Sequence, residues 1–106
     1  MYHKPKSTAH ASRLPIEQEA WMLHRFEDHE LVRLHLAPGE SMETHINEWR
    51  IIFFVLSGAG SLNVAGKLYE LQAEQSIAVK AGLERSWSNT GESVLELLAI
   101  KTRDKA

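Results

Sequence analysis

The chain contains no cysteine, only three prolines and no long hydrophobic run. Without cysteine it can form no disulfide, no thiolate nucleophile and no cysteine-based zinc or iron–sulfur site. The longest unbroken apolar run is the segment 51–56, whereas a membrane-spanning helix needs roughly 20 apolar residues. The sequence therefore predicts a protein that does not span a membrane.

The sequence also has no excess of positive charge. Twelve Lys and Arg residues stand against fourteen Asp and Glu residues, which gives a formal net charge of −2. No overall positive field exists to hold a nucleic-acid backbone or an anionic membrane, and we expect neither partner. The polar N-terminal stretch also lacks the apolar centre of a secretory signal, so the expected location is cytoplasmic.

The length and composition indicate one globular domain. The 106 residues are 43% hydrophobic and 25% charged, which is typical of a folded protein and too apolar for disorder. Residues 1–19 hold two of the three prolines and show no apolar periodicity, so they are expected to form an extended or disordered arm. Residues 20–106 are expected to form the single domain.

The apolar pattern from residue 20 onward favours short strands over helices. In the segment 31–37, Val32, Leu34 and Leu36 alternate with Arg33 and His35, as expected of a half-buried strand. Turn residues such as Ala65-Gly66 separate the apolar stretches. The expected strands cover residues 21–26, 31–37, 44–48, 51–56, 61–64, 67–71, 76–79, 84–88 and 94–101.

Two motifs with fixed spacing resemble those of the cupin superfamily. The first cupin motif, G-x5-H-x-H-x3-E-x6-G, is matched by Gly39, His45 and Gly58. The second, P-x-G-x2-H-x3-N, is matched by Gly82 and Asn89. The resemblance covers about residues 29–101. It implies an all-β fold of the cupin type, a jelly-roll β-barrel also called a double-stranded β-helix.

The departures from these motifs bear on metal binding. Metal-binding cupins hold one divalent ion with two histidines and a glutamate of the first motif and a histidine of the second. Those four positions read His45, Asn47, Ile51 and Arg85 here. Imidazole is a strong ligand, an amide oxygen is a weak one, isoleucine offers none, and guanidinium is a fixed cation. No metal and no other cofactor are therefore expected.

Other side chains offer little replacement for the missing ligands. Glu48 could stand in for the carboxylate only if a bulge turned it to the face of His45. His24 could join His45 in a weak two-histidine site if it pointed into one end of the barrel. The remaining histidines have no partner at ligand spacing and are expected on the surface: His3, His10, His29 and His35.

Strand alternation predicts what fills the barrel instead, because residues two apart in a strand share a face. An apolar concavity with a few polar groups is the usual form of a small-molecule site. The guanidinium of Arg85 suits a carboxylate or phosphate, although an ion pair with Glu43 or Glu48 is an equal alternative. The aromatic residues could equally be core filling. The expected ligand-binding residues are His45, Asn47, Trp49, Ile51, Phe53, Arg85 and Trp87.

The leading hypothesis is a metal-free, degenerate cupin that binds a small polar or anionic molecule in its barrel, as a sensor or accessory subunit. The alternative is an isomerase, epimerase or lyase in which His45 is the general base and Arg85 stabilises an oxyanion. A metal-dependent oxygenase is a third hypothesis, which the missing ligands disfavour. A homodimer is expected, and the basic ending 101–105 is interpreted as a solvated surface.

Overall fold

The protein is described by a computed structural model, which covers residues 12–14, 16 and 18–103. In these residues all regular structure is β, so the all-β class predicted from the sequence is confirmed. None of them belongs to a helix that could cross a membrane. The strands are β1 (Ser12–Arg13), β2 (Glu19–Arg25), β3 (His29–Leu36), β4 (His45–Ile46), β5 (Arg50–Ser57), β6 (Ala59–Val64), β7 (Lys67–Gln72), β8 (Ser76–Val79), β9 (Glu84–Ser88) and β10 (Leu95–Thr102).

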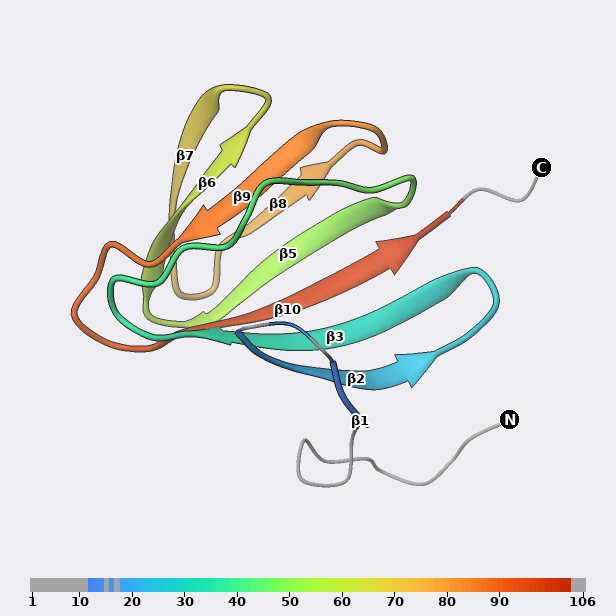
Figure 1. The fold of residues 1–106 in the computed structure, drawn as a ribbon, viewed down its shortest axis with the longest axis horizontal. Helices are drawn as coiled ribbons and strands as arrows, with labels where there is room; N and C mark the ends of the chain where they lie inside the picture. The colour runs from blue at the N-terminus through green and yellow to red at the C-terminus, as the bar shows by residue number, and fades with distance from the viewer. Residues whose placement is uncertain (1–11, 15, 17, 104–106) are drawn as a thin grey trace.

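The strands form two antiparallel sheets that face each other (Figure 1). One sheet has the order β1-β2-β3-β10-β5-β8 and the other has the order β4-β9-β6-β7. Strands far apart in the sequence pair directly, as β10 does with both β3 and β5. Short strands that cross between two packed sheets in this way define a jelly-roll barrel.

Two places differ from the strand pattern expected from the sequence. Only His45–Ile46 is strand in the segment 44–48, because the side-chain oxygen of Asn47 then accepts the backbone N–H of Trp49 at 2.9 Å and turns the chain. In the N-terminal segment, Ser12–Arg13 pairs with β2. The first eleven residues of the expected arm lie outside the described residues.

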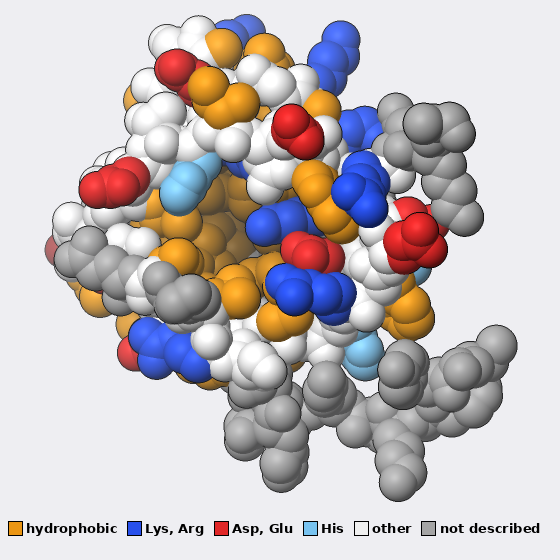
Figure 2. Space-filling model, turned by 45° about the vertical axis from the view of Figure 1, so that its right-hand side comes forward, with side chains coloured by type: hydrophobic (Ala, Val, Ile, Leu, Met, Phe, Trp, Pro, Cys, Tyr) orange, Lys and Arg blue, Asp and Glu red, His pale blue; other side chains and the backbone are white. Residues whose placement is uncertain are grey.

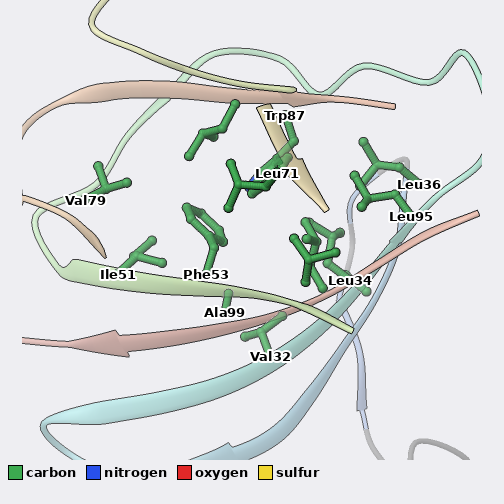
Figure 3. Packing of buried hydrophobic residues seen from close by; sticks show 14 residues of the cluster. Val32, Leu34, Leu36, Ile51, Phe53, Leu71, Val79, Trp87, Leu95 and Ala99 are labelled. Atoms are coloured by element: carbon green, nitrogen blue, oxygen red, sulfur yellow. The ribbon is translucent and has the colours of Figure 1, made fainter. Parts of the chain in front are cut away.

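The space between the sheets is partly hollow and partly packed. Figure 2 shows the hollow, whose walls are largely hydrophobic. In the packed part, side chains of the two sheets point toward one another (Figure 3), and the ring of Phe53 on β5 meets that of Trp87 on β9 edge-to-face, with centroids 5.4 Å apart. The buried apolar residues are Ala20, Val32, Leu34, Leu36, Ile51, Phe53, Val55, Leu62, Leu71, Val79, Trp87, Leu95, Leu97 and Ala99.

Asn89, one of the motif residues, fastens the loop after β9 to the barrel. Its side chain is buried, and the amide nitrogen donates to the backbone oxygens of Leu36 at 3.0 Å and Ser93 at 2.8 Å. The amide oxygen accepts the N–H of Gly91 at 2.9 Å. Three hydrogen bonds satisfy a buried amide well. Asn89 therefore has a structural role and is not part of the hollow.

Candidate small-molecule site

The hollow between the sheets is a cavity of about 210 Å³. Its walls are mainly apolar, and histidine and basic side chains lie around its opening in Figure 2. Apolar walls with a few polar groups are the usual composition of a small-molecule site. The lining residues are Leu14, Ile16, Ala20, Val32, Leu34, Met42, His45, Ile46, Asn47, Ile51, Phe53, Arg85, Ser86, Trp87, Ala99 and Lys101.

Six of the seven ligand-binding residues expected from the sequence line this cavity. They come from both sheets, and the register explains part of their convergence, because directly opposed residues of an antiparallel pair share a face. His45 on β4 lies opposite Arg85 on β9. The six are His45, Asn47, Ile51, Phe53, Arg85 and Trp87.

Trp49, the seventh, is not among the lining residues. The turn at Asn47 ends the regular alternation before Trp49 is reached. The indole instead lies beside the guanidinium of Arg103, whose central carbon is 5.0 Å from the ring centroid. Such a stack is a cation–π contact. Trp49 therefore packs outside the cavity.

Arg85 is the most unusual group in the cavity, because it is a buried cation with an unused donor. The residue is 5% exposed, and its Nη1 atom has no hydrogen-bond partner. Among the described residues no carboxylate forms an ion pair with it, so the alternative pairing with Glu43 or Glu48 is not formed. Burial lowers the pKa of Arg85. A buried charge without a partner is energetically unfavourable, and a bound anion would compensate it.

Lys101 is a second cation in the cavity, and the sequence interpretation missed it. It lies on β10 two residues after the buried Ala99, on the same inner face. Burial lowers the pKa of Lys101; Glu30 acts in the opposite direction, and Arg85 adds to the lowering. The expectation that residues 101–105 form a solvated surface is therefore wrong for Lys101. The alternation of Leu95, Leu97 and Ala99 could have revealed it.

The other histidines do not join the cavity lining. A register shift in β2 between Met22 and His24 pairs His24 with Leu31, one residue away from the cavity-lining Val32. His29 lies 2.7 Å from Asp28. His3 and His10 lie outside the described residues.

His35 is not a simple surface histidine. On the outer face of the six-stranded sheet its Nε2 atom lies 2.9 Å from Nε of Arg33 and 3.2 Å from Glu96, and its ring meets Trp21 edge-on. Burial lowers the pKa of His35. Arg33, His35 and Glu96 therefore bind one another on the outer face of the sheet.

The donors at the four motif positions do not fit a metal ion, although all four positions line one cavity. Among the described residues no group of three or more His, Asp or Glu side chains is placed to hold an ion. His45 is one donor, the side-chain oxygen of Asn47 already accepts a hydrogen bond, and Ile51 has no donor. Arg85 adds a positive charge to the same cavity. Protein metal sites need three or four ligands.

Manganese, iron, nickel and zinc are therefore expected to bind more weakly than micromolar. At ~4 Å and an effective dielectric near 20, two unit charges repel by about 4 kcal/mol, and a divalent ion would experience about twice that beside Arg85. Metal content and melting temperature, followed during titration of the tag-free protein, measure the affinity. Micromolar binding that disappears in His45→Ala would contradict the prediction and revive the oxygenase hypothesis.

A jelly-roll barrel with a cavity between its sheets is the architecture of the cupin family. The cupin domain matches residues 32–101 of this chain. Because this match spans more than half of the 106 residues, the chain belongs to the cupin family. This confirms the resemblance seen in the two motifs. No curated protein matches the chain at a significant level.

Solved structures show the same fold at low sequence identity. A protein from Thermotoga maritima described as a predicted oxalate decarboxylase has a TM-score of 0.83 and 23% identity over 93% of this chain and 98% of its own. The polyketide cyclase RemF from Streptomyces resistomycificus has a TM-score of 0.82 and 15% identity, covering 97% and 81%. The cupin domain of Cnp3 from Schizosaccharomyces pombe has a TM-score of 0.82 and 16% identity, covering 88% and 69%. These similarities establish the cupin fold and leave the activity open.

Proposed function

We propose that this cupin binds a small molecule with an anionic group inside its barrel, and that the anionic group contacts Arg85. The observation that carries the proposal is the buried Nη1 atom of Arg85, which has no acceptor. An arginine fork is suited to carboxylate or phosphate oxygens. A ligand that supplies these oxygens would complete a hydrogen bond and compensate a buried charge in one step.

The shape of the cavity restricts the rest of the ligand. At about 210 Å³ the cavity is smaller than the roughly 300–1,000 Å³ that accommodates drug-sized molecules. The walls near Arg85 include Phe53 and Trp87, which are almost fully buried, and the indole Nε1 of Trp87 is a second buried donor without a partner. The ligand is therefore a small anion, either a compact organic acid or a phosphate. The protein would act through this binding as a sensor or accessory subunit.

Calorimetric titration with benzoate, butyrate, succinate and inorganic phosphate tests the proposal. At least one of these anions is expected to bind to the wild-type protein and to raise its melting temperature. Arg85→Met should weaken that binding by about 10- to 100-fold, since a hydrogen bond to a charged group contributes about 1.5–3 kcal/mol.

The matched control is Arg103→Met, which removes an arginine that stacks on Trp49 outside the cavity. This variant should bind like the wild type. Equal binding to the wild type and to Arg85→Met, or no binding of any of the four anions, would contradict the proposal.

The enzymatic alternative, an isomerase, epimerase or lyase, is supported by the register that places His45 opposite Arg85. His45 is exposed and lines the cavity, so its imidazole is accessible both to solvent and to a bound ligand. Exchange of the carbon-bound protons of a bound acid for deuterium, abolished by His45→Gln with binding retained, would favour catalysis over simple binding. The homodimer and the cytoplasmic location stay predictions.

A further inference from the structure

Lys101 is not used by the proposed function, although it lines the same cavity as Arg85. We propose that the ligand carries two negative charges, one held by Arg85 and the other by Lys101. A short dicarboxylate and a phosphate both have this chemistry. The inference rests on the proposed function and adds the charge of the ligand to it.

The charged groups that face Lys101 come from three strands. Glu30 on β3 lies directly opposite it in the register, Arg25 lies on β2, and Arg85 lies on β9. Nε of Arg25 is 2.9 Å from the carboxylate of Glu30, whose side chain is 14% exposed. Glu30 is thus already engaged by one cation. Arg25 and Lys101 share the one carboxylate of Glu30, and Arg85 has no carboxylate partner among the described residues, so these four side chains carry a formal net charge of +2.

Lys101 and Arg85 repel each other inside a largely apolar cavity. Burial and the neighbouring arginines Arg85 and Arg25 lower the pKa of Lys101, against the effect of Glu30. A monoanion bound at Arg85 would leave the ammonium of Lys101 with only a shared carboxylate. A dianion would compensate both cations, and charge-assisted hydrogen bonds are about twice as strong as neutral ones. The cavity is therefore expected to discriminate by charge between acids of equal size.

The pH dependence follows from the lowered pKa of Lys101. Above its pKa in the free protein the amine is neutral, so the preference for a dianion is present at lower pH and is lost as the pH rises. The charged groups that face Lys101 are Glu30, Arg25 and Arg85, and none of them is removed in this comparison. His45 lines the same cavity. Binding of a dianion stabilises the ammonium form and so raises the pKa of Lys101.

Calorimetric titration at pH 7 with succinate, inorganic phosphate and butyrate tests the inference. Succinate and butyrate have the same number of carbons and differ by one carboxylate. Succinate or phosphate is expected to bind to the wild type at least about tenfold more tightly than butyrate. Lys101→Met should reduce this ratio to near one, because it removes the second cation from the cavity. Lys80→Met is the control, because Lys80 is exposed and is not among the lining residues.

The outcomes separate this inference from the proposed function. If succinate, phosphate and butyrate bind equally to the wild type and all are lost in Arg85→Met, the binding site stands and the inference is wrong. A preference for succinate or phosphate that survives Lys101→Met also overturns it. If none of these three anions binds, the inference is wrong, and the proposed function is wrong as well unless benzoate binds. The relative affinities of succinate and phosphate show whether the two charges come from a dicarboxylate or from a phosphate.

Discussion

Replacing Gly58 by alanine is expected to destabilise the barrel by about 2–4 kcal/mol, because two separate costs add at this position. Gly58 lies between β5 and β6 with φ at +84°, a conformation that residues with a side chain rarely adopt. A methyl group there would come 2.5 Å from the backbone oxygen of Val94 and 3.1 Å from Cα of Leu95. Both contacts are with backbone, so the chain itself would have to move.

Gly82→Ala is the matched control for this substitution. Gly82 has almost the same φ, +82°, but a methyl group there would meet nothing within 4 Å. Gly82→Ala should therefore lower the free energy of unfolding by only about 1 kcal/mol, the cost of placing alanine in this backbone conformation. Urea unfolding of both variants measures the difference. Equal free energies of unfolding for the two variants would show that the close approach of Val94 does not constrain Gly58.

Gly58 and Asn89 illustrate how much of the fold could be predicted from the sequence. Both were found as motif residues, and each occupies a place where the backbone needs that residue type, a left-handed turn for Gly58 and a buried amide for Asn89. The strand pattern was equally readable, since Val32, Leu34 and Leu36 are buried as their alternation predicts. Short-range spacing and periodicity determine these features.

The candidate site was harder to predict, because the set of residues that line the cavity depends on interruptions of the strands. Alternation placed Trp49 in the cavity, but the turn formed by Asn47 breaks the strand before it. A register shift after Met22 likewise keeps His24 out of the lining. Neither interruption can be located from alternation alone. Lys101 was missed for another reason: the basic stretch 101–105 was interpreted as a solvated surface, although the alternation of Leu95, Leu97 and Ala99 places Lys101 on their face of the strand.

Phe53 and Arg85 both line the cavity, but their substitutions should have opposite effects on stability. Phe53→Ala is expected to lower the free energy of unfolding by about 3–5 kcal/mol, since it removes a buried ring and leaves a cavity against Trp87. Arg85→Met keeps most of the side-chain volume and removes a buried charge that has no partner. Its free energy of unfolding is expected to be at least that of the wild type.

The contrast between these two variants tests whether Arg85 serves binding or structure. Urea unfolding at pH 7 gives both free energies, and Phe54→Ala, a half-buried phenylalanine next to Phe53 on the opposite face of β5, provides a control with a smaller expected loss. If Arg85 supported the barrel through contacts with its neighbours, Arg85→Met would unfold as readily as Phe53→Ala. A buried cation maintained for a ligand predicts the reverse: the free protein tolerates or gains from its removal, and the cost appears only when the anion is added.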